Sequence, residues 1–262
     1  MPKVRDVINA LESRIPPIWQ ENYDNTGIQY VEGNDECTGV MLCVDVTSEI
    51  LAEAVAKSCN LIITHHPLLF RARKSFQGRD RVESVTAEAI KKGINIYSCH
   101  TSADNAPHIG VSWVMAKRLG LKDIHCLTTS DDSLPGSGTI GDLKSPMRLS
   151  EFVAFVKKCF GSPVVRSSSA NLNALVKRVA LCGGAGTEFI TDAIKKNADV
   201  YITSDSKLNY FLDYADRIIL LDIGHYEAEE CTKEIFYDII TEKFPNFALY
   251  KSQSESNPVH YL

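Results

Sequence analysis

Short apolar runs alternate with amphipathic stretches along this chain, and the alternation predicts strands separated by helices. The apolar runs are rich in β-branched residues, as in strands covered on both faces, and predict strands over 39–46, 60–66, 94–100, 176–184, 198–205 and 217–224. The amphipathic stretches predict helices over 47–59, 81–93, 110–121, 186–197 and 227–244. Strands joined by helices of this length indicate βαβ units, so we expect an α/β fold with mostly parallel sheets.

The stretch 40–66 aligns without a gap with 179–205, and eight of the 27 columns are identical. Any two buried βαβ units share an apolar pattern, but the identities Cys43/Cys182 and Glu49/Glu188 exceed what that pattern requires. We therefore predict an internal duplication that produces two similar three-layer lobes. The loop-like stretch 128–138 places their boundary. The expected lobes are 1–127 and 128–262, with the C-terminal segment allowed to pack back on the first.

Composition narrows the classes of protein to consider. The chain has 262 residues, 44% of them hydrophobic and 23% charged, which is typical of globular proteins. A net charge of -5 gives no global basic field for nucleic acid or an anionic membrane. No apolar run approaches the roughly 20 residues of a membrane span, and the N-terminus lacks a signal-peptide pattern. The eight cysteines are dispersed, so we expect reduced thiols and a cytoplasmic location.

Four of the seven histidines lie at the ends of predicted strands, namely His65, His66, His100 and His225. Carboxylates accompany them at Asp104, Asp222 and Glu229. In open parallel sheets ligands collect outside the carboxyl ends of the strands. His225 and Glu229 are also four residues apart at the start of a predicted helix, so their side chains project from one face.

A single histidine at a strand end is more often a surface group than a ligand. Two adjacent histidines together with a His-x-x-x-Glu pair favour a site for Zn²⁺, Mn²⁺, Fe²⁺ or Co²⁺ instead. The role of His100 stays open between ligand, support for a ligand and proton shuttle. His108, His125 and His260 lack such neighbours and are not expected to bind metal.

Three motifs resemble the signatures of the NIF-three-like family of dinuclear metal proteins, whose members are often called GTP cyclohydrolase 1 type 2 homologs. They are THHP (64–67), SCHTSADNAPHIGVSWVMAKRLGL (98–121) and DIGHYEAE (222–229). Further similar stretches are DNTGIQ (24–29), LCVDVT (42–47), LCGGAG (181–186) and the tail NPVHYL (257–262). The resemblance covers nearly the whole chain, in the order of the family.

The resemblance implies two divalent metal ions per chain (Zn, Fe, Mn, Co or Ni) in the cleft between two similar lobes. The ligands that it implies are His65, His66, Asp104, His225 and Glu229, with Glu229 in a bridging role. It also implies self-association into a ring, a homohexamer. The chain departs from the family at Leu208 and Asn209, where many members carry a histidine, and it has no room for the central domain of longer members.

These features predict a metal-dependent hydrolase that acts on a phosphoester or a nucleotide-like substrate, with His100 moving the proton. A basic stretch also follows the histidine pair, at Arg71, Arg73, Lys74, Arg79 and Arg81. We favour a solvated loop there, and the alternative is a clamp for a phosphate-bearing ligand.

The alternative function is a non-catalytic metal-binding regulatory or scaffold protein with protein partners. Other enzyme classes lack support. The stretch GGAG (183–186) matches neither nucleotide-binding glycine motif, and the chain contains no G-x-S-x-G.

Overall fold

The computed structural model describes residues 1–33 and 35–262, and the chain forms two compact units. Unit 1 comprises Met1–Ala103 and Thr232–Ser256, and unit 2 comprises Asp104–Cys231 and Asn257–Leu262. Residues 104–127 therefore belong to unit 2, and Thr232–Ser256 belongs to unit 1, the lobe on which the C-terminal segment was allowed to pack. No helix within the described part of the chain is long and apolar enough to cross a bilayer.

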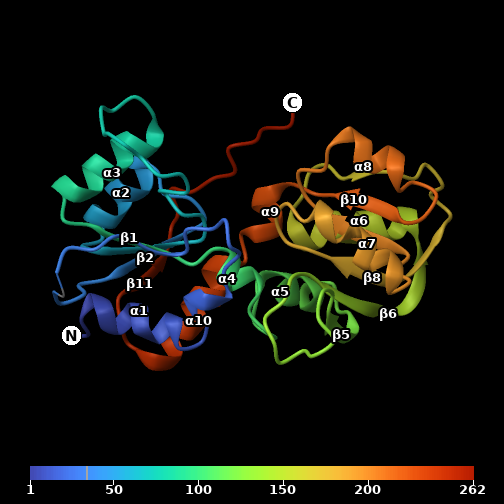
Figure 1. The fold of residues 1–262 in the computed structure, drawn as a ribbon, viewed down its shortest axis with the longest axis horizontal. Helices are drawn as coiled ribbons and strands as arrows, with labels where there is room; N and C mark the ends of the chain where they lie inside the picture. The colour runs from blue at the N-terminus through green and yellow to red at the C-terminus, as the bar shows by residue number, and fades with distance from the viewer. Residues whose placement is uncertain (34) are drawn as a thin grey trace. The chain divides into compact units, whose positions relative to one another are not determined.

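Unit 1 is built on a five-stranded sheet of order β1-β4-β3-β2-β11 (Figure 1). The strands are β1 (Gly27–Tyr30), β2 (Val40–Cys43), β3 (Leu61–Thr64), β4 (Asn95–Ser98) and β11 (Leu249–Lys251). All neighbours pair in parallel except β1, which runs antiparallel to β4 at the edge. The predicted strands over 39–46, 60–66 and 94–100 are thus confirmed as the centre of a mainly parallel sheet.

Helices cover both faces of this sheet. They are α1 (Val4–Glu12), α2 (Ser48–Ala56), α3 (Arg81–Lys91) and α10 (Thr232–Lys243), with a short 3-10 helix at Pro17–Trp19 and α4 (Thr101–Asp104) at the end of the unit. Met41 and Cys43 of β2 pack in one apolar cluster with residues of α2 and α3. The alternate residues Val40 and Leu42 are equally buried, and α10 packs on β2 and β11. Unit 1 therefore has the three layers expected from the sequence.

Unit 2 contains a six-stranded sheet of order β5-β6-β8-β9-β10-β7. The strands are β5 (Lys122–Cys126), β6 (Thr139–Arg148), β7 (Arg166–Ser167), β8 (Leu175–Leu181), β9 (Val200–Thr203) and β10 (Ile219–Asp222). Its helices are α5 (Val111–Arg118), α6 (Leu149–Phe160), α7 (Ile190–Lys195), α8 (Leu208–Asp213) and α9 (His225–Glu229), with a 3-10 turn at Thr187–Phe189. β8, β9 and β10 are parallel, and antiparallel strands flank them.

The predicted repeat is visible in the pairing register. In unit 1 Leu42 of β2 pairs with Ile63 of β3, and in unit 2 Leu181 of β8 pairs with Ile202 of β9. An offset of 139 residues carries the first pair onto the second. Register depends on the turns and on which side chains face the core, so the equal registers support a duplication.

The prediction of one long helix over 227–244 is wrong. The helix α9 ends at Glu229, and α10 begins at Thr232, after a turn at 230–231. The chain passes from unit 2 to unit 1 at this turn. The helix α9 belongs to unit 2 and α10 belongs to unit 1, so the helical stretch breaks where the chain leaves one unit for the other.

All eight cysteines are thiols, and all except the half-buried Cys159 are buried. Burial raises the pKa of Cys37 to about 12 and that of Cys59 to about 11. Such thiols behave as small apolar residues rather than as nucleophiles.

Candidate metal centre

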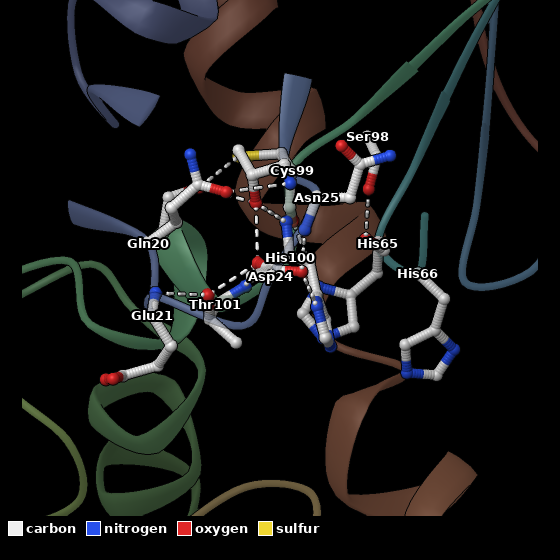
Figure 2. A network of polar contacts seen from close by, with 12 residues as sticks. Gln20, Glu21, Asp24, Asn25, His65, His66, Ser98, Cys99, His100 and Thr101 are labelled. Atoms are coloured by element: carbon white, nitrogen blue, oxygen red, sulfur yellow. Dashed lines mark hydrogen bonds and ion pairs between the residues drawn. The ribbon is translucent and has the colours of Figure 1, made fainter. Parts of the chain in front are cut away.

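Three histidine rings lie together at the carboxyl edge of the unit 1 sheet (Figure 2). His65 and His66 follow β3, and His100 stands two residues after β4. The ring centroids are 5.0, 5.1 and 5.4 Å apart, and one ring nitrogen of each histidine lies within 4.8 Å of the other two. Parallel pairing of β3 with β4 places both strand ends at one edge, so two local motifs supply one cluster.

An oxygen holds the Nδ1 atom of each ring in this cluster. His65 Nδ1 lies 3.1 Å from the carbonyl oxygen of Cys99, and His66 Nδ1 lies 2.9 Å from Asp45 Oδ2. His100 Nδ1 lies 2.7 Å from Asp24 Oδ1. Carbonyl and carboxylate oxygens only accept hydrogen bonds, so Nδ1 must carry the proton. In the neutral rings the lone pair is then on Nε2, the atom through which such supported histidines bind metals.

Asp24 is the most completely bonded carboxylate of the cluster, although its loop precedes β1. Its side chain is fully buried, and it also accepts hydrogen bonds from Thr101 N, Thr101 Oγ1 and Thr26 Oγ1. Burial raises the pKa of Asp24, but the hydrogen bonds from His100, Thr101 and Thr26 outweigh it and hold this pKa well below its usual value. Asp24 is therefore an ionised anchor that sets the orientation of His100 (Figure 2).

The loop that carries Asp45 is supported from the C-terminal part of unit 1. Glu255 Oε1 accepts the backbone N–H groups of Val44 at 2.6 Å and Asp45 at 3.1 Å, and Glu255 Oε2 lies 2.7 Å from Lys233 Nζ. Burial raises the pKa of Asp45, but the hydrogen bond to His66 and the charges of His66 and Arg81 lower it more strongly. The pKa of Asp45 is therefore below its usual value. The ionised Asp45 thus keeps its hydrogen bond with His66.

In unit 2, His225 begins α9 and Glu229 ends it, which confirms the predicted spacing on one helical face. His225 Nε2 lies 2.9 Å from Glu229 Oε2, and His225 Nδ1 lies 2.7 Å from Asp205 Oδ2. Burial lowers the pKa of His225, but the Glu229 and Asp205 carboxylates raise it more strongly, to about 11. A divalent ion beside Glu229 would replace the proton on Nε2.

Gly184, in the loop after β8, leaves space for the Glu229 carboxylate. Its φ is +66°, and a Cβ built there would overlap Glu229 Oε1. Only glycine satisfies both conditions. Gly184 of the GGAG stretch therefore leaves the room that the Glu229 carboxylate of the candidate site occupies.

Asp104 ends α4 and is the first residue of unit 2. Burial raises the pKa of the Cys182 thiol, and the negative charge of Asp104 raises it further.

The structure brings three imidazoles together in unit 1 and supplies an imidazole and two carboxylates in unit 2. This nitrogen and oxygen donor set suits Zn²⁺ and the neighbouring divalent transition metals.

The basic stretch after the histidine pair is largely neutralised by acids of its own unit. Arg79 Nη2 lies 2.7 Å from Glu83 Oε1, and Arg73 Nη1 lies 2.8 Å from Asp80 Oδ2. Arg81 begins α3 and donates to the carbonyl oxygen of Val46 at 2.6 Å. These contacts are those of a structured loop and helix start, although all five basic residues of the stretch are exposed.

Three carboxylates that orient histidines escaped the sequence reasoning, namely Asp24, Asp45 and Asp205. Asp45 stands two residues after the end of β2, and Asp205 stands two residues after the end of β9. The same strand-end argument could therefore have found both. Asp24 opens the stretch DNTGIQ (24–29), whose resemblance to the family was the available signal, but its pairing with His100 could not be read from positions so far apart along the chain.

A model of the Duf34/NIF3 family (NGG1p interacting factor 3) matches residues 2–258 of this chain. Two relatives, both named GTP cyclohydrolase 1 type 2 homolog, cover 87% of this chain with 87% of their own length. One, from Nostoc sp., is 36% identical over 230 residues, and the other, from Clostridium perfringens, is 32% identical over 229 residues. Among solved structures, a hypothetical protein of Staphylococcus aureus is 27% identical, with a TM-score of 0.92 and full coverage of both chains. A Bacillus cereus protein related to NIF3 shares the fold, with a TM-score of 0.92 at 22% identity over 100% of this chain and 99% of that one.

Proposed function

This chain belongs to the Duf34/NIF3 family, and from that premise and the donor set we propose that it is a dinuclear metal-dependent hydrolase. The residues that would hold the two divalent ions are those that the family resemblance implies: His65, His66, Asp104, His225 and Glu229. The substrate class is a phosphoester or a nucleotide-like compound, in line with the name that the relatives carry.

The orientation of the histidine rings is the observation that carries this proposal. His65, His66 and His225 each direct Nδ1 to an oxygen, which presents Nε2 as the ligand atom. A histidine that serves only packing does not need a carboxylate or a carbonyl at Nδ1, whereas a metal-binding histidine almost always has one. The same arrangement in both units is the expected state of a prepared metal site.

When bound, two such ions supply the positive charge that activates water and stabilises a hydrolytic transition state. His100 then acts as the proton carrier, because Asp24 fixes its Nδ1–H and leaves Nε2 to accept or return a proton. The Asp24 carboxylate is fully buried and lies 2.7 Å from Nδ1, so it keeps the ring in one orientation.

Metal content by mass spectrometry, on protein purified without an affinity tag, tests this proposal. We expect about two ions per chain in the wild type and a loss of metal in the variant His65→Ala/Glu229→Ala. His125→Ala is the matched control, because His125 also pairs with a carboxylate, Asp132 at 2.7 Å, but its side chain is 59% exposed. Metal-free wild type that takes up no Zn²⁺, Mn²⁺ or Fe²⁺ would refute the proposal.

A phosphoester and nucleotide screen of the metal-loaded protein tests the hydrolase part separately. We expect turnover that disappears in His65→Ala/Glu229→Ala. Two bound ions without turnover of any tested compound would favour the metal-binding regulatory or scaffold protein instead.

We further propose that the chain assembles into a homohexameric ring, as the family resemblance implies. Light scattering coupled to size exclusion is expected to give six times the chain mass of 29.0 kDa. A monomer or dimer at micromolar concentration would contradict this assembly.

A further inference from the structure

A pocket of about 440 Å³ lies in unit 1 beside the histidine cluster. Its lining residues are Asp24, Asn25, Leu69, Phe70, Ala72, Arg73 and Phe76. This volume is within the range of small-ligand sites. The pocket adjoins the cluster through Asp24, which bonds to His100, and through Phe70, whose ring centroid lies 6.1 Å from that of His100.

Two phenyl rings dominate the apolar lining, and both are accessible. Phe70 is 44% exposed and Phe76 is 49% exposed. Aromatic faces stack favourably on flat π-systems, and a base stacked on an aromatic side chain gains affinity whatever its sequence identity. Two such rings in one small pocket therefore suit a flat ligand better than an aliphatic one.

The loop that presents Phe76 is fixed before any ligand arrives. Glu83 is 1% exposed and accepts the backbone N–H groups of Gln77 at 2.8 Å and Arg79 at 3.1 Å. The Arg79 guanidinium pairs with the same carboxylate, and Arg73 bridges Asp80 and Glu83 at 2.8 and 3.8 Å. The wall of the pocket is thus preorganised, which lowers the entropic cost of binding.

The polar groups of the pocket indicate an uncharged ligand portion. Arg73 is already neutralised by Asp80, so it does not offer a free charge for phosphate. Asp24 accepts hydrogen bonds from His100, Thr101 and Thr26. Asn25 donates through Nδ2 to the carbonyl oxygen of Leu69 at 2.9 Å, which orients the amide, and an amide oxygen can only accept hydrogen bonds.

We propose that this pocket binds the planar nitrogen-containing ring of the ligand, a nucleobase, between Phe70 and Phe76. The bound ring then lies next to His100, so the pocket selects compounds whose reactive part reaches the histidine cluster. This inference rests on the proposed hydrolase function, for which it specifies a nucleotide as the substrate class.

Calorimetric titration of the metal-loaded protein with adenosine 5′-monophosphate and with ribose 5-phosphate tests the inference, because the two probes differ only by the base. We expect the nucleotide to bind at least tenfold more tightly. Phe70→Leu and Phe76→Leu each remove a ring at a half-exposed position and are expected to weaken nucleotide binding about tenfold, with ribose 5-phosphate affinity within twofold of the wild type. Phe70→Tyr keeps the ring and is expected to retain nucleotide affinity within about threefold.

Equal affinity for the two probes, or equal losses for both probes in the leucine variants, would overturn the nucleobase pocket. That result leaves the hydrolase proposal standing if two metal ions are present and the phosphoester screen shows turnover. Loss of the hydrolase proposal is recognised separately, by absent metal or absent turnover in the same preparation.

Discussion

Replacement of Glu255 by glutamine tests whether the C-terminal segment of unit 1 supports the metal site. Glu255 and Lys233 form an ion pair at 2.7 Å, and their side chains are 5% and 8% exposed. Glu255 also accepts the backbone N–H groups of Val44 and Asp45. Removal of one partner from a buried pair costs about 3–5 kcal/mol, because the other charge stays buried. Glutamine retains one acceptor oxygen for the two N–H groups, so we expect about 3 kcal/mol.

Urea unfolding followed by circular dichroism at pH 7 measures this change in the free energy of unfolding. Glu88→Gln is the matched control, because it removes a surface pair, Lys92 Nζ to Glu88 Oε1 at 2.7 Å, which is worth only about 0.3–0.5 kcal/mol. The double variant Lys233→Met/Glu255→Gln removes both charges and is expected to be more stable than Glu255→Gln alone.

Glu255→Gln has a consequence for metal binding as well. Asp45 receives support from Glu255 through its backbone and holds His66 through its side chain. Substitutions that disturb such indirect support usually lower metal affinity by about 10–100-fold, and we expect a loss of this size. A free energy of unfolding equal to that of Glu88→Gln, with metal affinity unchanged, would refute the reasoning.

Three further predictions concern single sites. Glu53 accepts hydrogen bonds from Ser252 and from the backbone of 253–254. These bonds outweigh burial and lower the pKa of Glu53 from its usual 4.5 to about 2. The ionised form therefore stabilises the fold above pH 4.5, and this stabilisation is lost as pH falls towards 2. Glu53→Gln should therefore lower the free energy of unfolding by about 1–2 kcal/mol at pH 7. In urea titrations between pH 5 and 3, the free energy of unfolding of the variant should fall less steeply than that of the wild type. Parallel plots of this free energy against pH would contradict the prediction. Gly184→Ala should lower the metal content, and it should lower the free energy of unfolding by about 1–3 kcal/mol. Gly120→Ala is the control, because Gly120 has the same φ of +66° but no atom within 4 Å of the added Cβ, and it should retain metal. Equal metal content in the two variants would be inconsistent with the overlap at Glu229. Asp24→Asn should reduce kcat about 100-fold with two metal ions still bound, and unchanged kcat would remove His100 from the proton pathway.

Much of the fold could be predicted from periodicity, because its central elements are short and locally determined. The buried runs before His65 and His100 became β3 and β4, and the repeat of 40–66 in 179–205 became two strand pairs with the same register. Strands outside the parallel centres of the sheets were not predicted. β6, which lies between β5 and β8, contains Pro146 and a register shift between Asp142 and Met147, so its sequence does not alternate like a regular strand.

The break between α9 and α10 was missed for a different reason. The stretch 227–244 keeps a helical pattern throughout, and the pattern contains no glycine or proline at 230–231. The chain passes between two units at that turn, and each helix packs against its own unit. Local propensity cannot report such a division, since tertiary packing overrides it.

The sequence by itself determined which metal-binding side chains the chain offers and that His65, His66 and His100 stand at strand ends, because strand termination is a local property. Only the tertiary structure decided how those rings are held. Asp24 reaches His100 from 76 residues away, and Glu255 reaches Val44 from 211 residues away. Contacts over such separations depend on how sheets and loops pack, and no periodicity along the chain encodes them. The types of candidate ligand are therefore readable in local motifs, whereas the tautomer and orientation of the rings come from the folded units.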